Sequence, residues 1–226
     1  MEHNDTVIVL LAPADGALLT APVDSAAAEL ATSLPAGSRV RVAHLLDDPY
    51  PLGGEWTGVI ELHGDAAAIA KALDGLADRL GSSIDAERSA VVVGRDRVIF
   101  ERAIPDGVRP VKMYYALFAY DNRPFDRAEF SRQWTEGHAP LVEHSPYQLT
   151  YYQLHADPEA TAAASAAAGF GIGNIAGVAH EEFPAKDALA AAAVDPDLAD
   201  ERGDLAIFAD RDRSRGMLSH TTVLRG

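Results

Sequence analysis

The sequence predicts an α+β protein built from two successive units that share one order of elements, β-α-β-β-α-β. Short runs of β-branched and aromatic residues, typical of strands, alternate with Ala-rich segments whose apolar residues have helical spacing. This order occurs twice in 226 residues, although the halves share the pattern and little sequence identity. Proline and glycine punctuate residues 105–110, so we expect one unit at 1–106 and another at 107–226.

The first unit is expected to hold two helices among its strands. Asp24 is the predicted N-cap of the first helix, which ends before Pro35 and Gly37. Asp65 is the predicted N-cap of the second helix, whose apolar residues keep helical spacing as far as Gly81. The predicted strands are 6–11, 38–45, 56–62 and, on either side of a Gly-Arg-Asp turn, 90–93 and 98–102.

The second unit repeats this order. Between its middle strands, residues 157–176 are rich in Ala and Gly, and form either a small helix with a turn or a mobile flap. The acidic segments 195–204 and 209–215 are interpreted as solvated surface. Strands are expected at 111–118, 149–155, 177–183 and 217–224, with helices after Asp126 and at 185–193.

One stretch, residues 125–141 (FDRAEFSRQWTEGHAPL), carries the most strongly patterned chemistry. Asp126 and Glu129 have the spacing of an N-cap and the third residue of a helix. Phe125 and Phe130 can close a hydrophobic staple across that start. We therefore expect a helix to begin at Asp126.

This helix is expected to point a histidine inward. Pro140 removes a backbone donor and disfavours α geometry at Ala139, so a kink beside His138 is predicted, which leaves room for a ligand. The alternative is a core histidine satisfied by a backbone carbonyl. If the helix continues through Gly137, four residues at steps of four, four and three share one face: Phe130, Trp134, His138 and Leu141.

Composition excludes several classes of protein. The net charge is −15, with 19 Lys+Arg against 34 Asp+Glu and no basic run, so neither nucleic acid nor an anionic membrane surface is expected as a partner. The chain has no cysteine, which excludes disulfides, thiolate zinc sites and a cysteine nucleophile. No apolar stretch approaches the length of a membrane span, and the first residues are acidic where a secretory signal is basic, so a cytoplasmic location is expected.

The second half carries a specific pattern, W-x3-H-x-P-L, at Trp134, His138, Pro140 and Leu141. Around it stand the strand VKMYYALF, the strand LTYYQLH and the segment GVAHEEFPAKDAL. Together these segments, within 111–224, resemble the EthD family of the dimeric α+β barrel superfamily.

The resemblance implies a fold and a kind of chemistry. The fold is two ferredoxin-like units, each a sheet with helices on one face, whose sheets would pack into a barrel within this single chain. The chemistry is cofactor-free proton transfer in a cavity between sheet and helices, often with a histidine as acid or base. The first half, at residues 25–37, has neither the tryptophan nor the histidine, so it is interpreted as a degenerate structural unit and one site per chain is expected.

His138 is the residue expected to act as general acid and base, because an imidazole titrates near ~6.5 and can take and return a proton at neutral pH. We assign catalysis to His138, Tyr151 and His155, and substrate binding to Trp134, Tyr115, Leu141 and His180.

The strand parity behind these assignments is open. Tyr114 could replace Tyr115 and Tyr152 could replace Tyr151, with His220 on a neighbouring strand. Each tyrosine could instead place its hydroxyl at the rim of the sheet. No element has metal-ligand spacing such as H-x-H or H-E-x-x-H, so no metal is expected. The resemblance implies that no cofactor is needed.

These expectations favour a cofactor-independent lyase, cyclase or isomerase. The substrate would be a hydrophobic, oxygenated small molecule such as a polyketide or cyclic ketone, transformed by dehydration, aldol-type or enolisation chemistry. Two alternatives stay open: a non-catalytic binding or stress-response protein, and a cofactor-free monooxygenase. The expected partners are this small molecule and, through the barrel units, a second copy of the chain.

Overall fold

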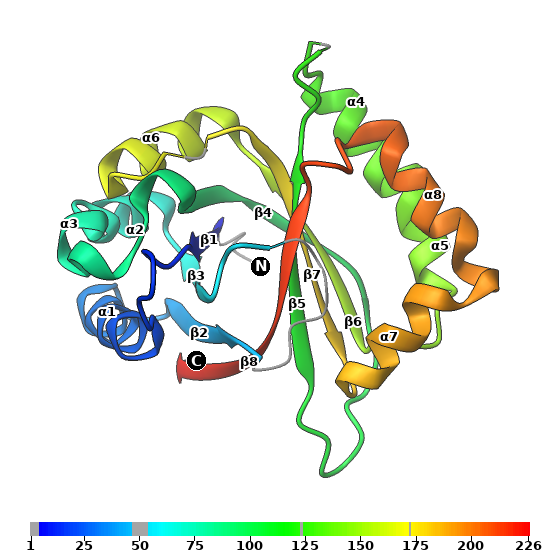
Figure 1. Cartoon of the computed structure of the whole chain (residues 1–226), viewed down its shortest axis with the longest axis horizontal. Coiled ribbons are helices and arrows are strands. Elements are labelled where there is room, and N and C mark those ends of the chain that lie inside the picture. The colour runs from blue at the N-terminus through cyan, green and yellow to red at the C-terminus, as the bar shows by residue number, and fades with distance from the viewer. Residues whose placement is uncertain (1–4, 47–53, 123, 172) are drawn as a thin grey trace.

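The chain folds into a closed antiparallel β-barrel flanked by helices, as the computed structural model in Figure 1 shows. The structure describes residues 5–46, 54–122, 124–171 and 173–226. Around the barrel the strands follow the order β1-β3-β2-β8-β5-β7-β6-β4. Their bounds are β1 (Asp5–Leu11), β2 (Arg39–Leu45), β3 (Gly58–Gly64), β4 (Ala90–Glu101), β5 (Val111–Phe118), β6 (Thr150–Ala156), β7 (Ile175–Phe183) and β8 (Arg215–Arg225).

Helices cover two opposite sides of the barrel (Figure 1). One side holds α1 (Thr20–Ser33), α2 (Ala66–Leu73), α3 (Leu76–Leu80) and α6 (Pro158–Ala168). The other side holds α4 (Arg127–Arg132), α5 (Ala139–Glu143), α7 (Lys186–Val194) and α8 (Ala199–Phe208). Helix α6 belongs to the second half of the sequence, yet it packs on β4 and α2 of the first half. Among the described residues, no helix combines the length and the apolar character needed to cross a bilayer.

Each half of the sequence contributes four neighbouring strands with the same internal order. The first half supplies β4-β1-β3-β2 and the second half supplies β8-β5-β7-β6. The two sets join through the antiparallel pairs β2 with β8 and β4 with β6. The predicted α+β class and the predicted barrel are therefore confirmed.

Alternation along the strands settles the parity that the sequence left open. Tyr114 points into the barrel, where its hydroxyl donates to Glu61, and Tyr152 stacks on the interior His180. Tyr115 and Tyr151 therefore lie on the face that the helices cover.

One part of the barrel interior is polar and charged. Glu61 is 0% exposed, and its carboxylate accepts from Lys112 Nζ at 2.6 Å, Tyr114 Oη at 2.8 Å and Arg41 at 2.8 Å. His63 Nε2 lies 2.8 Å from the same carboxylate. Burial would raise the pKa of Glu61, but Lys112 and these hydrogen bonds hold it well below its ordinary value. The carboxylate is thus ionised and fully paired inside the barrel.

Three expected elements of the first half are wrong in detail. Helix α1 begins at Thr20, so Asp24 is not its N-cap; its carboxylate instead contacts His44 Nε2 at 2.8 Å. The helix after Asp65 is broken by Gly75, whose φ of 64° ends α2 before α3 starts. Residues 90–101 form one strand, because Gly94 allows the close approach of the β6 backbone and makes no turn.

Two expectations in the second half resolve differently. Residues 158–168 form α6, ended by Gly169 at a φ of 80°, so the helix alternative is confirmed; residue 172 lies outside the described residues. The acidic segment 195–204, interpreted as solvated surface, contributes to α8, whose Phe208 is buried against the other helices.

The first four residues, used to judge a secretory signal, also lie outside the described ranges.

Substituting Glu61 by Gln should destabilise the protein by about 3–5 kcal/mol, because the buried ammonium of Lys112 loses its counter-charge. Urea unfolding at pH 7 measures this loss. The exposed pair Arg95–Asp5 is the control, since Arg95→Gln should cost no more than about 1 kcal/mol. Equal effects of the two substitutions would contradict this view of the barrel interior.

Candidate active site

The site is built on the helix that begins at Asp126. The Asp126 carboxylate accepts the backbone N–H groups of Ala128 and Glu129, so the predicted N-cap is confirmed. The rings of Phe125 and Phe130 lie 5.6 Å apart and close the start of the helix, as expected of a staple.

After α4 the helix widens into a π-helical turn, Gln133–His138. The carbonyl of Trp134 accepts the N–H of Ala139, five residues on, and also the side-chain amide of Gln153 at 2.9 Å. Insertion of a side chain into the helical ladder is a common cause of such a turn. The helix is therefore irregular, as predicted, but the irregularity is the π-helical turn before His138 and not a kink at Pro140. Pro140 lies inside the first turn of α5, where a proline is tolerated.

Trp134 anchors this turn to the barrel. Its indole is fully buried and lies over Gly177 of β7, where a Cβ atom would overlap the ring. Its Nε1–H donates to Tyr151 Oη at 2.8 Å. Gly177 is thus a position where packing excludes any side chain.

A cavity of about 350 Å³ lies between the outer face of β5, β6 and β7, the π-helical turn, and the helices α7 and α8. Most of its wall is apolar, including Met113, Leu117 and Leu205. Four of the seven predicted site residues line it: Trp134, His138, Tyr115 and Tyr151. Its size and apolar lining match those of sites for small molecules.

His138 faces a carboxylate within this region. Its Nδ1 lies 3.5 Å from Asp204 Oδ2 on α8. Both atoms are buried, and neither has a hydrogen-bond partner elsewhere in the described part of the chain. Each is therefore the natural partner of the other, at a distance that a small side-chain rotation would shorten to a hydrogen bond.

Burial decides the charge of the histidine at rest. It lowers the pKa of His138 from 6.5 to about 4, so the imidazole is neutral at pH 7. Burial also raises the pKa of Asp204. A proton gained by His138 would nevertheless stand beside a carboxylate, which stabilises an imidazolium formed during a reaction.

Tyr151 is oriented by two donors. Its oxygen accepts from Trp134 Nε1 at 2.8 Å and from Gln153 Nε2 at 3.2 Å. A tyrosine hydroxyl can donate as well as accept, and a donor at this place can stabilise a developing negative charge on a substrate oxygen. The centroids of the His138 and Tyr151 rings lie 6.4 Å apart, and both residues line the cavity.

His155, predicted to be catalytic, lies outside this cavity. Its Nδ1 is 2.8 Å from Ser131 Oγ and its Nε2 is 3.1 Å from Gln153 Oε1, beneath the ring of Trp134. Burial and the neighbouring cations Arg97 and Arg127 lower its pKa to about 4. These cations would oppose an imidazolium, so the catalytic role of His155 stays a prediction that the cavity beside His138 does not support.

His180 and Leu141, predicted to bind substrate, also lie elsewhere. His180 points into the barrel, where its Nε2 is 2.9 Å from Asp96 Oδ1, because its parity on β7 is opposite to that of the cavity-lining residues Ala179 and Glu181. Leu141 is half-buried on α5 and does not line the cavity. The π-helical turn shifts the helical phase after Trp134, so regular steps of four and three misplace Leu141.

Four polar or charged residues of this region escaped the sequence assignment, and one of them is Arg211, which lines the cavity. Glu181 lines the cavity beside Tyr151, its partner on the neighbouring strand, and Gln148 lines it from the loop before β6. Asp204 was hidden in an acidic run interpreted as surface. Its spacing of four from Phe208 is the signal that could have placed it on a buried helical face.

Comparison with known proteins agrees with this geometry. Residues 122–212 match the family model of the EthD domain. This segment resembles EthD domains. The match runs from the approach to α4 into the loop after α8, so it includes His138, Tyr151 and Asp204. No curated protein matches the chain in sequence.

Solved structures extend the likeness of the fold beyond the EthD domain to the whole chain. An anthrone oxidase-like protein superposes with a TM-score of 0.61 at 11% identity, covering 98% of this chain and 94% of that chain. A candidate monooxygenase from Lactobacillus acidophilus gives 0.54 at 13% identity, covering 99% and 97%. A chlorite dismutase variant from Candidatus Nitrospira defluvii gives 0.54 at 10% identity, covering 97% and 92%. At these identities the likeness establishes the fold alone.

Two buried histidines of this segment, His138 and His155, should make the stability of the protein depend on pH. Their pKa values are about 4 in the folded chain, against ~6.5 when unfolded, so the unfolded chain binds more protons between these values. Their contribution is complete above pH ~6.5 and is lost as the pH falls towards 4.

Urea unfolding at pH 7 and pH 5 should show a loss on the order of 2 kcal/mol for each histidine. His138→Gln should remove about half of this loss. An unchanged pH dependence in that variant would contradict the burial of a neutral imidazole at this position.

Proposed function

We propose that this protein is a cofactor-independent enzyme that transfers a proton on a hydrophobic, oxygenated small molecule, with His138 as general acid and base. The observation that carries the proposal is the facing of His138 Nδ1 and Asp204 Oδ2 at 3.5 Å beside an apolar cavity that also holds Tyr151. A lyase, cyclase or isomerase of polyketides or cyclic ketones uses this chemistry.

The proposed step begins with a neutral imidazole. Asp204 holds the proton on Nδ1, which leaves the lone pair of Nε2 to remove a proton from a carbon next to a carbonyl. The carbonyl oxygen gains negative charge and is stabilised by the Tyr151 hydroxyl. His138, now an imidazolium beside Asp204, returns the proton to the enolate or to a leaving hydroxyl, which gives isomerisation or dehydration.

Tyr115 and Trp134 complete the proposed binding surface. Burial raises the pKa of Tyr115, so its phenol stays protonated and can donate a second hydrogen bond to substrate. Trp134 supplies an apolar wall. His155 and His180 are not part of this proposal.

A second candidate, cofactor-free oxygenation, is favoured by the names of structural neighbours. The anthrone oxidase-like protein and the candidate monooxygenase share the fold. An enolate formed by His138 is electron-rich, and its reaction with dioxygen in place of a proton would give an oxygenated product. Both candidates therefore use the same first step, and they differ in whether the enolate then reacts with a proton or with dioxygen.

We also infer that the two halves are two ferredoxin-like units, as the strand orders β4-β1-β3-β2 and β8-β5-β7-β6 support. The boundary near residue 106 stays a prediction, because the barrel closes across both halves. In this proposal the first half supplies the barrel wall and the second half supplies the chemistry.

Anthrone in D₂O provides one test with three separate outcomes. The proposal predicts enzyme-dependent exchange of its acidic C–H for deuterium, measured by NMR, without oxygen consumption above the uncatalysed rate. Exchange together with oxygen uptake would favour the monooxygenase. Binding without either would favour the non-catalytic protein.

His138→Ala should remain folded and lose at least about 100-fold of the exchange rate, the contribution typical of a general base. Asp204→Asn should lower the rate less and should change its pH dependence, because the amide cannot stabilise an imidazolium. His144→Ala, which alters an exposed histidine, is the control. A fully active His138→Ala variant would overturn the proposal.

A further inference from the structure

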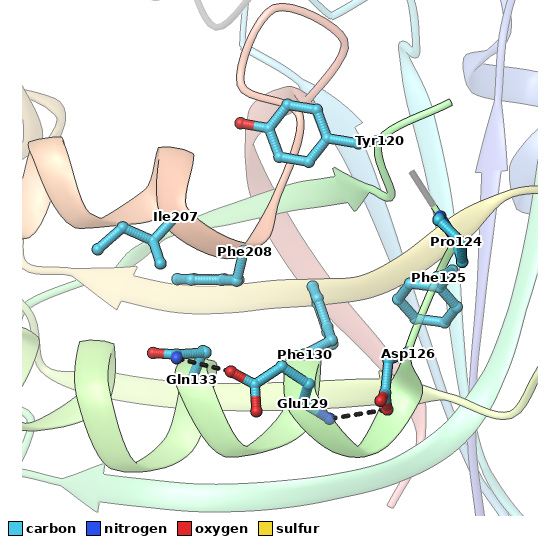
Figure 2. Close-up of a pocket in the computed structure, with 9 residues that line it drawn as sticks. All are labelled: Tyr120, Pro124, Phe125, Asp126, Glu129, Phe130, Gln133, Ile207 and Phe208. Atoms are coloured by element: carbon cyan, nitrogen blue, oxygen red, sulfur yellow. Dashed lines mark hydrogen bonds between the residues drawn. The ribbon is translucent and has the colours of Figure 1, made fainter. Parts of the chain in front are cut away.

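A second pocket of about 210 Å³ lies at the other end of the contact between α4 and α8 (Figure 2). It shares no lining residue with the cavity beside His138. Phe208 separates the two, since its ring contacts Phe130 at 5.6 Å on one side and His138 at 5.6 Å on the other. The pocket is therefore a site distinct from the proposed catalytic one.

Four of the nine described residues that line the pocket are aromatic. Figure 2 shows Tyr120, Phe125, Phe130 and Phe208 around one space, contributed by α4, α8 and the segments beside them. The Phe130 ring is inclined by 60° to Phe125 and by 71° to Phe208. Rings at such steep angles line the pocket from different directions, as the walls of a cage do.

The charged residues that line the pocket are both acidic. Asp126 stands at the start of α4 and Glu129 lies on it, in the lower half of Figure 2. No Lys, Arg or His is among the described lining residues. The Asp126 Oδ1 atom caps α4, while Glu129 pairs with Arg132 at the exposed surface, where solvent screens such a pair. Together with the net charge of −15, these carboxylates make the pocket attractive to cations.

We propose that this pocket binds the methylated ammonium group of a small organic cation, such as a choline-like molecule. A cation over aromatic faces is attracted by their negative electrostatic potential, and methyl groups fit an apolar wall that a hydrated metal ion would not match. The nearby carboxylates add charge attraction. A neutral apolar group would fill the space but would gain nothing from the negative charge of Asp126 and Glu129.

Size and exposure agree with a head group. The volume is below the ~300–1,000 Å³ of pockets that enclose whole drug-sized ligands. Phe125 is 42% exposed and Ile207 is 54% exposed at this pocket. A bound ammonium group would cover apolar surface that is now in water, while the rest of its molecule stayed outside.

The test is calorimetric titration of the full chain with choline, with its uncharged carbon isostere 3,3-dimethylbutan-1-ol, and with sodium at the same ionic strength. Choline should bind at least tenfold more tightly than the isostere, and sodium should not compete. Phe125→Leu keeps apolar volume and removes the ring, so it should weaken choline binding on the order of tenfold.

A matched pair of charge variants locates the site. Glu129→Gln should weaken choline binding severalfold, whereas Glu136→Gln, on the same helical stretch and outside the pocket, should not change it. Circular dichroism confirms that each variant is folded. Equal binding of choline and its isostere, no binding of choline, or binding that Phe125→Leu and Glu129→Gln leave unchanged would each overturn the proposal.

Discussion

The geometry of the candidate site depends on the packing of the Trp134 indole against Gly177. The indole can lie against β7 only because residue 177 has no side chain. There the indole Nε1–H donates to the hydroxyl of Tyr151. The backbone carbonyl of Trp134 accepts the side-chain amide of Gln153 as well as the backbone N–H of Ala139. The helix consequently widens at this point, and His138, at the end of the wide turn, lines the cavity.

The chemical difference between two histidines follows from what faces each of them. Burial lowers the pKa of both His138 and His155 to about 4. His138 has Asp204 at 3.5 Å, whereas Arg97 and Arg127 act on His155. An imidazolium is stabilised at the first position and opposed at the second, so similar burial leads to different roles. The barrel interior follows the same rule, since Glu61 stays ionised only because cations surround it.

Much of this fold was predictable because local patterns determine it. The cap at Asp126, the strands of the second half and the pairing of Trp134 with His138 on one stretch all rest on short-range spacing. The rest depends on contacts distant in sequence. Gln153 creates the π-helical turn that displaces Leu141, strand pairing sends His180 inward, and packing of Phe208 brings Asp204 to the site. The acidic composition of residues 195–204 gives no sign that Phe208 packs in the core. Only the helical spacing of the apolar residues in and after this segment indicates a buried face.

The tautomer of His138 tests most directly whether Asp204 prepares the imidazole to act as a base. Nitrogen-15 NMR of the histidine-labelled protein at pH 7 distinguishes the two neutral forms and the cation, with Asp204→Asn and His138→Gln spectra to assign the signal. We expect a neutral ring with its proton on Nδ1 and a free lone pair on Nε2. A ring protonated on Nε2 alone, or one that Asp204→Asn leaves unchanged, would contradict the proposed pairing.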